Sequence, residues 1–208
     1  NSDLVISSDN GEDFSFISKK YNCKDYIHGK QSHGFPATHP QNSKTRFGWT
    51  VEEAKLWLNR MYRACLIMDS KFVMDVEEDV LIQSRFNFED ADILMMGVSG
   101  GKIVKNPIQP SALKWIESRG GKVDYPYYSA CGGSIVNRLS FIESYERNID
   151  SFVDNYEDIY QKSIKERLNS DGKKSGWGWP DSILCVIMYC KSKNVKIGYS
   201  PISQLGYD

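Results

Sequence analysis

The sequence predicts one α/β domain over residues 1–208, with a mostly parallel central sheet flanked by helices. Strand-like apolar runs alternate with helix-like amphipathic segments, and no internal repeat or low-complexity segment interrupts them. A chain of 208 residues is long enough for one sizeable core and short for two. Because the first residue is not Met, the sequence is compatible with a fragment of a longer chain.

The first half of the chain supplies two strands and two helices. Residues 3–7 form an apolar run that ends in turn formers, residues 13–21 suit a short helix, and residues 24–29 suit a second strand. Residues 30–49 have no periodicity and predict a loop. Residues 51–69 repeat their apolar side chains at helical spacing. The expected core positions of this helix are Ala54, Trp57 or Leu58, Met61, Cys65 and Met68.

The second half continues the alternation. Strands are predicted at 71–76, 90–99 and 195–200, helices at 110–121, 148–168 and 176–194, and a strand that turns into a helix at 126–147. The helix at 110–121 closes with two glycines, and Pro180 suits the first turn of a helix.

Composition and charge limit the function. The 26 Lys and Arg balance 27 Asp and Glu, so the net charge of −1 supplies no broad field, and we expect neither a nucleic-acid partner nor an anionic membrane surface. No apolar run reaches the roughly 18–20 residues of a membrane span. Five scattered cysteines and the lack of a glycosylation sequon favour a reducing compartment. We therefore expect a cytoplasmic protein without a membrane span, for which a monomer is the favoured state.

Two familiar patterns are set aside. Residues 97–101 match G-x-S-x-G, but the prolines that follow oppose the helix that a nucleophile elbow needs. All three histidines also precede Ser99, whereas the hydrolase order places the histidine last. Cys23 and the histidines fit no standard zinc spacing.

A cluster of carboxylates follows the strand at 71–76. Glu77, Glu78 and Asp79 come at its carboxyl end, where α/β sheets bind ligands. Adjacent carboxylates repel one another, and a cation relieves this repulsion. Mg²⁺ and Mn²⁺ prefer such oxygen ligands and often bridge to phosphates. The cluster therefore predicts a divalent metal beside a phosphorylated ligand, with a solvated turn as the alternative.

Four segments resemble one enzyme family in its order along the chain. "VMDVEEDVLI" resembles the strand and DxD segment of GT-A nucleotide-sugar glycosyltransferases, and "LVISSDN" resembles their first strand. "YSACGGSIVNRLSF" resembles the Gly-Gly segment beside the donor sugar, and "GWGWPDSIL" resembles the late aromatic-plus-acid segment. The likeness spans residues 4 to about 188 and is nearest to the compact single-domain enzymes of large algal DNA viruses, the chlorella viruses. It implies a single GT-A (Rossmann-like) domain, located in the host cytoplasm if the chain is viral.

The resemblance implies a metal and nucleotide site. Asp79 matches the family's metal-binding position for Mn²⁺ or Mg²⁺, and Glu77 assists it. The triplet lacks a strict Asp-x-Asp, and Asp75-x-Glu77 is a second possible frame. Other implied nucleotide contacts are Ser7, Ser8, Asp9, Arg63 and Glu78. An Asx-turn is the alternative role for Asp9, and a solvated surface position is the alternative for Arg63.

The resemblance also implies a sugar site. Asp181 is the implied catalytic base of an inverting reaction, although many members have Glu-Asp there, and an Asp at a helix start is also favoured by the helix dipole. The implied contacts of the donor or acceptor sugar are Cys131, Gly132, Gly133, Trp177 and Trp179. Core packing is the alternative for the tryptophans, and a bulge is the alternative for the glycines.

Together these features predict a metal-dependent glycosyltransferase that moves a hexose or deoxyhexose from a UDP-sugar donor to a glycan or other hydroxyl acceptor, with inversion. Two alternatives remain. A sugar-phosphate nucleotidyltransferase would normally carry a Gly-rich basic loop where this chain has the acidic "SSDNGED". A catalytically inactive module that binds nucleotide sugars is the other.

Overall fold

The computed structural model describes residues 4–8, 13–27, 51–74, 92–95, 98–99, 102–103, 106–108, 110–123, 127–128, 135–170, 180–190 and 197–199. The helices are α1 (Ser15–Tyr21), α2 (Val51–Ile67), α3 (Pro110–Ser118), α4 (Arg138–Ser170) and α5 (Pro180–Tyr189). The strands are β1 (Val5–Ser8), β2 (Lys24–Ile27), β3 (Phe72–Met74), β4 (Ile93–Met95), β5 (Val98–Ser99), β6 (Lys102–Ile103), β7 (Asn106–Pro107), β8 (Tyr127–Tyr128), β9 (Ile135–Asn137) and β10 (Ile197–Tyr199). The predicted loop at 30–49 lies outside the described residues. No helix in the described ranges is long and apolar enough to cross a membrane.

The largest sheet among the described strands has four members in the order β10-β4-β9-β3. β10 runs parallel to β4, whereas β9 runs antiparallel to both β4 and β3. β1 and β2 form a separate parallel pair, and β5–β6 and β7–β8 form short antiparallel pairs. The described sheet is thus mixed around β9, and a mostly parallel sheet across the whole domain stays a prediction.

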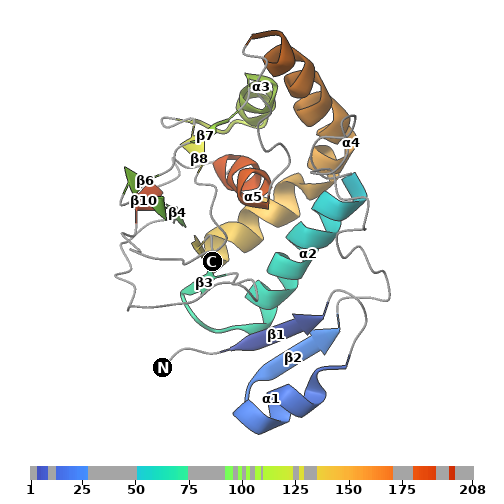
Figure 1. Cartoon of the computed structure of the whole chain (residues 1–208), viewed down its shortest axis with the longest axis vertical. Coiled ribbons are helices and arrows are strands. Elements are labelled where there is room, and N and C mark those ends of the chain that lie inside the picture. The colour runs from blue at the N-terminus through green and yellow to red at the C-terminus, as the bar shows by residue number, and fades with distance from the viewer. Residues whose placement is uncertain are drawn as a thin grey trace.

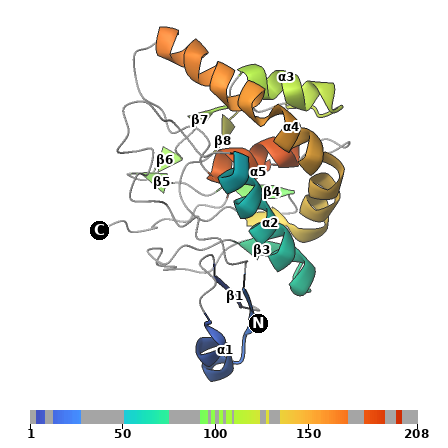
Figure 2. The ribbon, with the colours of Figure 1, turned by 90° about the vertical axis from the view of Figure 1, so that its right-hand side faces the viewer.

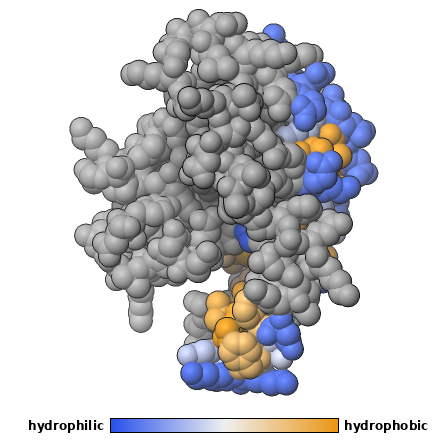
Figure 3. All heavy atoms as spheres, turned by 45° about the vertical axis from the view of Figure 1, so that its right-hand side comes forward, coloured by the Kyte–Doolittle hydropathy of each residue, from blue (hydrophilic) through white to orange (hydrophobic). Residues whose placement is uncertain are grey.

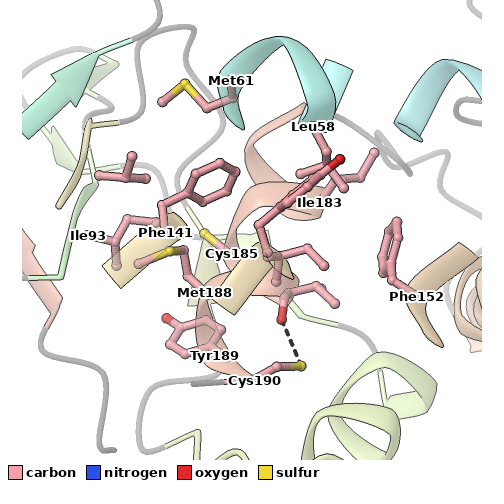
Figure 4. Packing of buried hydrophobic residues seen from close by; sticks show 14 of the residues in the cluster. Leu58, Met61, Ile93, Phe141, Phe152, Ile183, Cys185, Met188, Tyr189 and Cys190 are labelled. Atoms are coloured by element: carbon pink, nitrogen blue, oxygen red, sulfur yellow. Dashed lines mark hydrogen bonds between the residues drawn. The ribbon is translucent and has the colours of Figure 1, made fainter. Parts of the chain in front are cut away.

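Helix α5 lies at the centre of the helical layer, between α2, α3 and α4 (Figure 1). Its described side chains, Ile183 and residues 185–190, are all buried. Figure 4 shows Met188 and Cys185 among Leu58 and Met61 of α2 and Phe141 of α4. A helix that is apolar all round must be enclosed on every side, which explains why three helices gather on α5.

The core face of α2 is the one that the sequence predicts. Every expected core position is buried, with Trp57 and Leu58 both inside; the set is Ala54, Trp57, Leu58, Met61, Cys65 and Met68. This face packs on α4 and α5. The segment 126–147 contains a strand, β9, that turns into a helix as predicted, and this helix continues through the one predicted at 148–168 to form α4, of 33 residues. Figure 2 shows α3 alongside α4.

The start of α4 is fastened to the sheet. The N–H of Arg138 donates to the carbonyl of Lys71, and its Nη1 donates to the carbonyl of Cys65 at 3.2 Å. Asn137 caps the helix, since its Oδ1 accepts from the N–H of Ser140, and the Ser140 hydroxyl donates to Asp92. These bonds join α4 to the entrances of β3 and β4.

The β1–β2–α1 unit lies at one end of the molecule (Figure 1). The Lys24 Nζ donates to the carbonyl of Ile67 at 2.7 Å and links β2 to the end of α2. Leu4, Phe16 and Tyr21 are exposed, and Figure 3 shows apolar side chains gathered over β1 and α1.

The end of α3 is closed by the two predicted glycines. Gly120 has φ +79°, its N–H donates to the carbonyl of Glu117, and the N–H of Gly121 donates to the carbonyl of Ile116, which is a Schellman arrangement. A Cβ on Gly121 would overlap the carbonyl oxygen of Tyr189 at the end of α5. Gly121 therefore allows the close approach of α3 to α5.

We expect Gly121→Ala to lower the free energy of unfolding by about 1–3 kcal/mol, because the added methyl meets backbone atoms that cannot move aside. A Cβ on Gly120 would meet no other atom, so the cost of Gly120→Ala comes only from the left-handed backbone conformation. We expect this substitution to lower the free energy of unfolding by about 1 kcal/mol. Urea unfolding monitored by circular dichroism measures both. A smaller loss for Gly121→Ala than for Gly120→Ala would contradict the close approach.

Candidate functional site

Strands from distant parts of the chain end together at one edge of the four-stranded sheet. Met74, the last residue of β3, pairs with Ile135, the first residue of β9. Leu94 of β4 also pairs with Ile135, and Met95 pairs with Tyr199, the last residue of β10. The chain therefore leaves β3, β4 and β10 at the same edge at which it enters β9. We call this edge, defined by Met74, Met95, Ile135 and Tyr199, the site edge.

Two of the predicted site segments are attached to the site edge. The carboxylates Glu77, Glu78 and Asp79 follow β3 in the sequence, and Cys131, Gly132 and Gly133 precede β9. These six residues, like Asp75, lie outside the described residues. The pairing of Met74 with Ile135 shows that the two segments join the sheet at neighbouring points.

The predicted nucleotide contacts are placed in part. Ser7 and Ser8 are the last residues of β1 and pair with Tyr26 and Ile27 of β2, and the next residue, Asp9, lies outside the described residues. Among the described strands, β1 does not pair with the sheet that forms the site edge. Arg63 is half-buried on α2, away from the face that carries Leu58 and Met61. The contact of Ser7, Ser8 and Arg63 with a nucleotide at the site edge therefore stays a prediction.

The predicted catalytic acid begins a helix. Asp181 is the second residue of α5 and directly follows Pro180, which occupies the first helical position as predicted. This position places the Asp181 backbone in the first turn, where the helix dipole favours a carboxylate. Trp177 and Trp179 lie outside the described residues.

The described part of the chain contains no group of three or more His, Cys, Asp or Glu side chains that could hold a metal ion. The predicted ligands, Asp79 and Glu77, lie outside this part. Their chemistry fits the implied ion, because paired carboxylates are the oxygen donors that Mg²⁺ and Mn²⁺ select.

The G-x-S-x-G pattern has the wrong local structure for a hydrolase. Ser99 ends β5 and pairs with Lys102 of β6, so a second strand follows where a nucleophile elbow requires a helix. This hairpin agrees with the exclusion made from the sequence.

Comparison with protein-family models, with curated proteins and with solved structures gives no match for this chain.

Most of the described thiols are buried. Cys65, Cys185 and Cys190 are buried, and Cys23 is half-exposed. Burial raises the pKa of the Cys65 thiol to about 12, and the positive charge of Arg138 offsets this rise only in part. Burial likewise raises the pKa of the Cys190 thiol to about 12, and this thiol lies 3.3 Å from the carbonyl oxygen of Val186 (Figure 4). These thiols suit packing rather than nucleophilic chemistry.

We expect iodoacetamide at pH 8 to label Cys23 in the folded protein and to spare Cys65 and Cys190. A pKa of about 12 leaves a thiolate fraction on the order of 10⁻⁴ at that pH, and the fraction rises only as the pH approaches 12. Peptide mass spectrometry measures the labelling, and the same reaction in urea is the control that makes all three accessible. Native labelling of Cys65 at the rate of Cys23 would contradict the burial.

Proposed function

We propose that this chain is a metal-dependent glycosyltransferase that moves a sugar from a UDP-sugar to a hydroxyl of a glycan or other acceptor, with inversion. The observation that supports it most is the pairing of Met74 with Ile135. The resemblance assigns the segment after β3 to the metal and the segment before β9 to the donor sugar. These two groups must be neighbours in a donor complex, and the site edge joins their segments.

In this proposal Asp79 and Glu77 hold Mn²⁺ or Mg²⁺. When bound, the ion would neutralise the negative charge that grows on the leaving diphosphate. Glu78 accepts hydrogen bonds from the ribose hydroxyls, and Ser7, Ser8 and Asp9 contact the base and ribose. Arg63 presents its guanidinium to a phosphate.

Asp181 acts as the general base. Its carboxylate takes the proton of the acceptor hydroxyl while the hydroxyl oxygen bonds to the anomeric carbon and the bond from that carbon to the diphosphate breaks. A single displacement of this kind inverts the anomeric centre. Trp177 and Trp179 stack on sugar rings, and backbone amides of the segment Cys131 to Gly133 approach the donor.

We expect UDP to bind with a dissociation constant on the order of micromolar in the presence of Mn²⁺, and far more weakly in EDTA. Asp79→Asn removes a metal ligand and should weaken binding by at least about tenfold. Isothermal calorimetry measures both. The matched control is Asp154→Asn, which neutralises an exposed carboxylate in the middle of α4 and should leave UDP binding unchanged. Equal binding with and without metal would overturn the metal site.

We expect Asp181→Asn to retain metal-dependent UDP binding and to lose about 10²–10⁴-fold in transfer rate, because the acceptor proton has no base. Transfer is measured as UDP release from a panel of UDP-sugars with hydroxyl acceptors. Full transfer activity of Asp181→Asn would exclude Asp181 as the general base. Metal-dependent binding without turnover by the wild type would favour the inactive module, and release of pyrophosphate from UTP and a sugar phosphate would favour the nucleotidyltransferase.

A further inference from the structure

Two arginines that no predicted motif includes meet where α3 and α5 end. Arg119 directly follows α3 and is half-buried, and Arg147 is exposed in the first half of α4. The Arg119 Nε donates to Oδ1 of Asn148 at 3.1 Å, and its Nη2 donates to the carbonyl of Arg147 at 3.3 Å. The Arg147 Nη2 donates to the carbonyl of Cys190 at 3.1 Å. Both guanidinium groups also act on the pKa of the Cys190 thiol, so they lie near the same point.

The Arg119 side chain is held by a rigid support. Asn148 is fully buried, and its Nδ2 donates to the carbonyl of Ser144 at 2.8 Å. The Ser144 hydroxyl donates in turn to the carbonyl of Ile187 on α5. The Oδ1 of Asn148 is therefore fixed in position, and Arg119 is oriented before any ligand arrives.

The two guanidinium groups keep most of their hydrogen-bond capacity. A guanidinium has five N–H donors, and the bonds above occupy two donors of Arg119 and one of Arg147. All their acceptors are neutral amide or carbonyl oxygens. Within the described ranges neither arginine forms a hydrogen bond or an ion pair with a carboxylate.

The positive charge of the two guanidinium groups exceeds the opposing charge of the two helix ends. The carboxyl end of a helix carries roughly half a negative charge, so the ends of α3 and α5 together offset about one of the two positive charges. Of these charges about one positive charge remains, and each guanidinium keeps N–H donors that the bonds above do not use. One guanidinium commonly binds a phosphate through two N–H donors, and a tetrahedral oxyanion has further oxygens that can accept from a second guanidinium.

We infer that Arg119 and Arg147 form a second binding site, for a phosphate-type oxyanion, separate from the proposed donor site. Asp181 is in the first turn of α5, whereas Arg147 bonds to the carbonyl of Cys190 just beyond its last residue, about 13 Å along the helix axis. The site does not depend on the glycosyltransferase proposal, and it requires no metal.

The test titrates inorganic phosphate into the folded chain in EDTA, with chloride keeping the ionic strength constant. Nitrogen–proton NMR spectra monitor the Nε–H signals of Arg119 and Arg147, which we expect to shift saturably. Arg147→Gln removes an exposed guanidinium and should weaken phosphate binding by about tenfold or more. Arg147→Lys keeps the positive charge but loses the planar guanidinium with its paired N–H donors. This variant should bind phosphate with intermediate affinity.

The control is Lys114→Gln, which removes an exposed positive charge from α3 and should leave phosphate binding unchanged. Thermal unfolding is the second measurement, since a ligand of the folded state raises the Tm of the wild type more than that of Arg147→Gln. Linear, unsaturable shifts, or equal affinity in wild type and Arg147→Gln, would overturn the site. Because EDTA is present, this result is independent of metal-dependent UDP binding, so either proposal can fail alone.

Discussion

Burial of α5 is the constraint on which the helical layer depends. Its described side chains are all enclosed, so the helix cannot remain in water and requires an apolar face from each neighbour. α2, α3 and α4 supply these faces, and Gly121 lets α3 come close enough to do so. Polar groups lie at both ends of this helix: Asp181 is in its first turn, and the carbonyl of Cys190 directly follows its last residue.

Local patterns in the sequence predicted much of the secondary structure. The helical spacing of apolar residues identified the buried face of α2, and the glycines after Ser118 identified the end of α3. From the sequence, residues 147 and 148 fall in separate predicted segments, whereas α4 runs through both, and buried Asn148 is held inside it by its bonds to Ser144 and Arg119. An Asn is a weak helix former in isolation, and only tertiary contacts show why it is tolerated there. The antiparallel direction of β9 likewise depends on partners far away in the chain.

The candidate site is predictable in its chemistry and less so in its geometry. A run of carboxylates after an apolar strand indicates a cation, and this argument needs only adjacent residues. That β3 and β9 meet at one edge depends on the pairing of short strands, which residue types alone do not specify. No sequence pattern identifies Arg119 and Arg147, because one follows α3 and the other lies within α4. Their shared surroundings exist only after α3, α4 and α5 have packed.

The continuity of α4 has a consequence for how the domain opens. Its first residues are bonded to the entrances of β3 and β4, and its later residues support Arg119 and pack against α3 and α5. One helix thus belongs to the sheet and to the helical layer at once. Separating the two layers requires breaking α4 or the bonds at its start, so the sheet and the helices form one cooperative folding unit. We therefore expect the slowest amide hydrogen exchange to extend from β9 through the buried turns of α4 to α5.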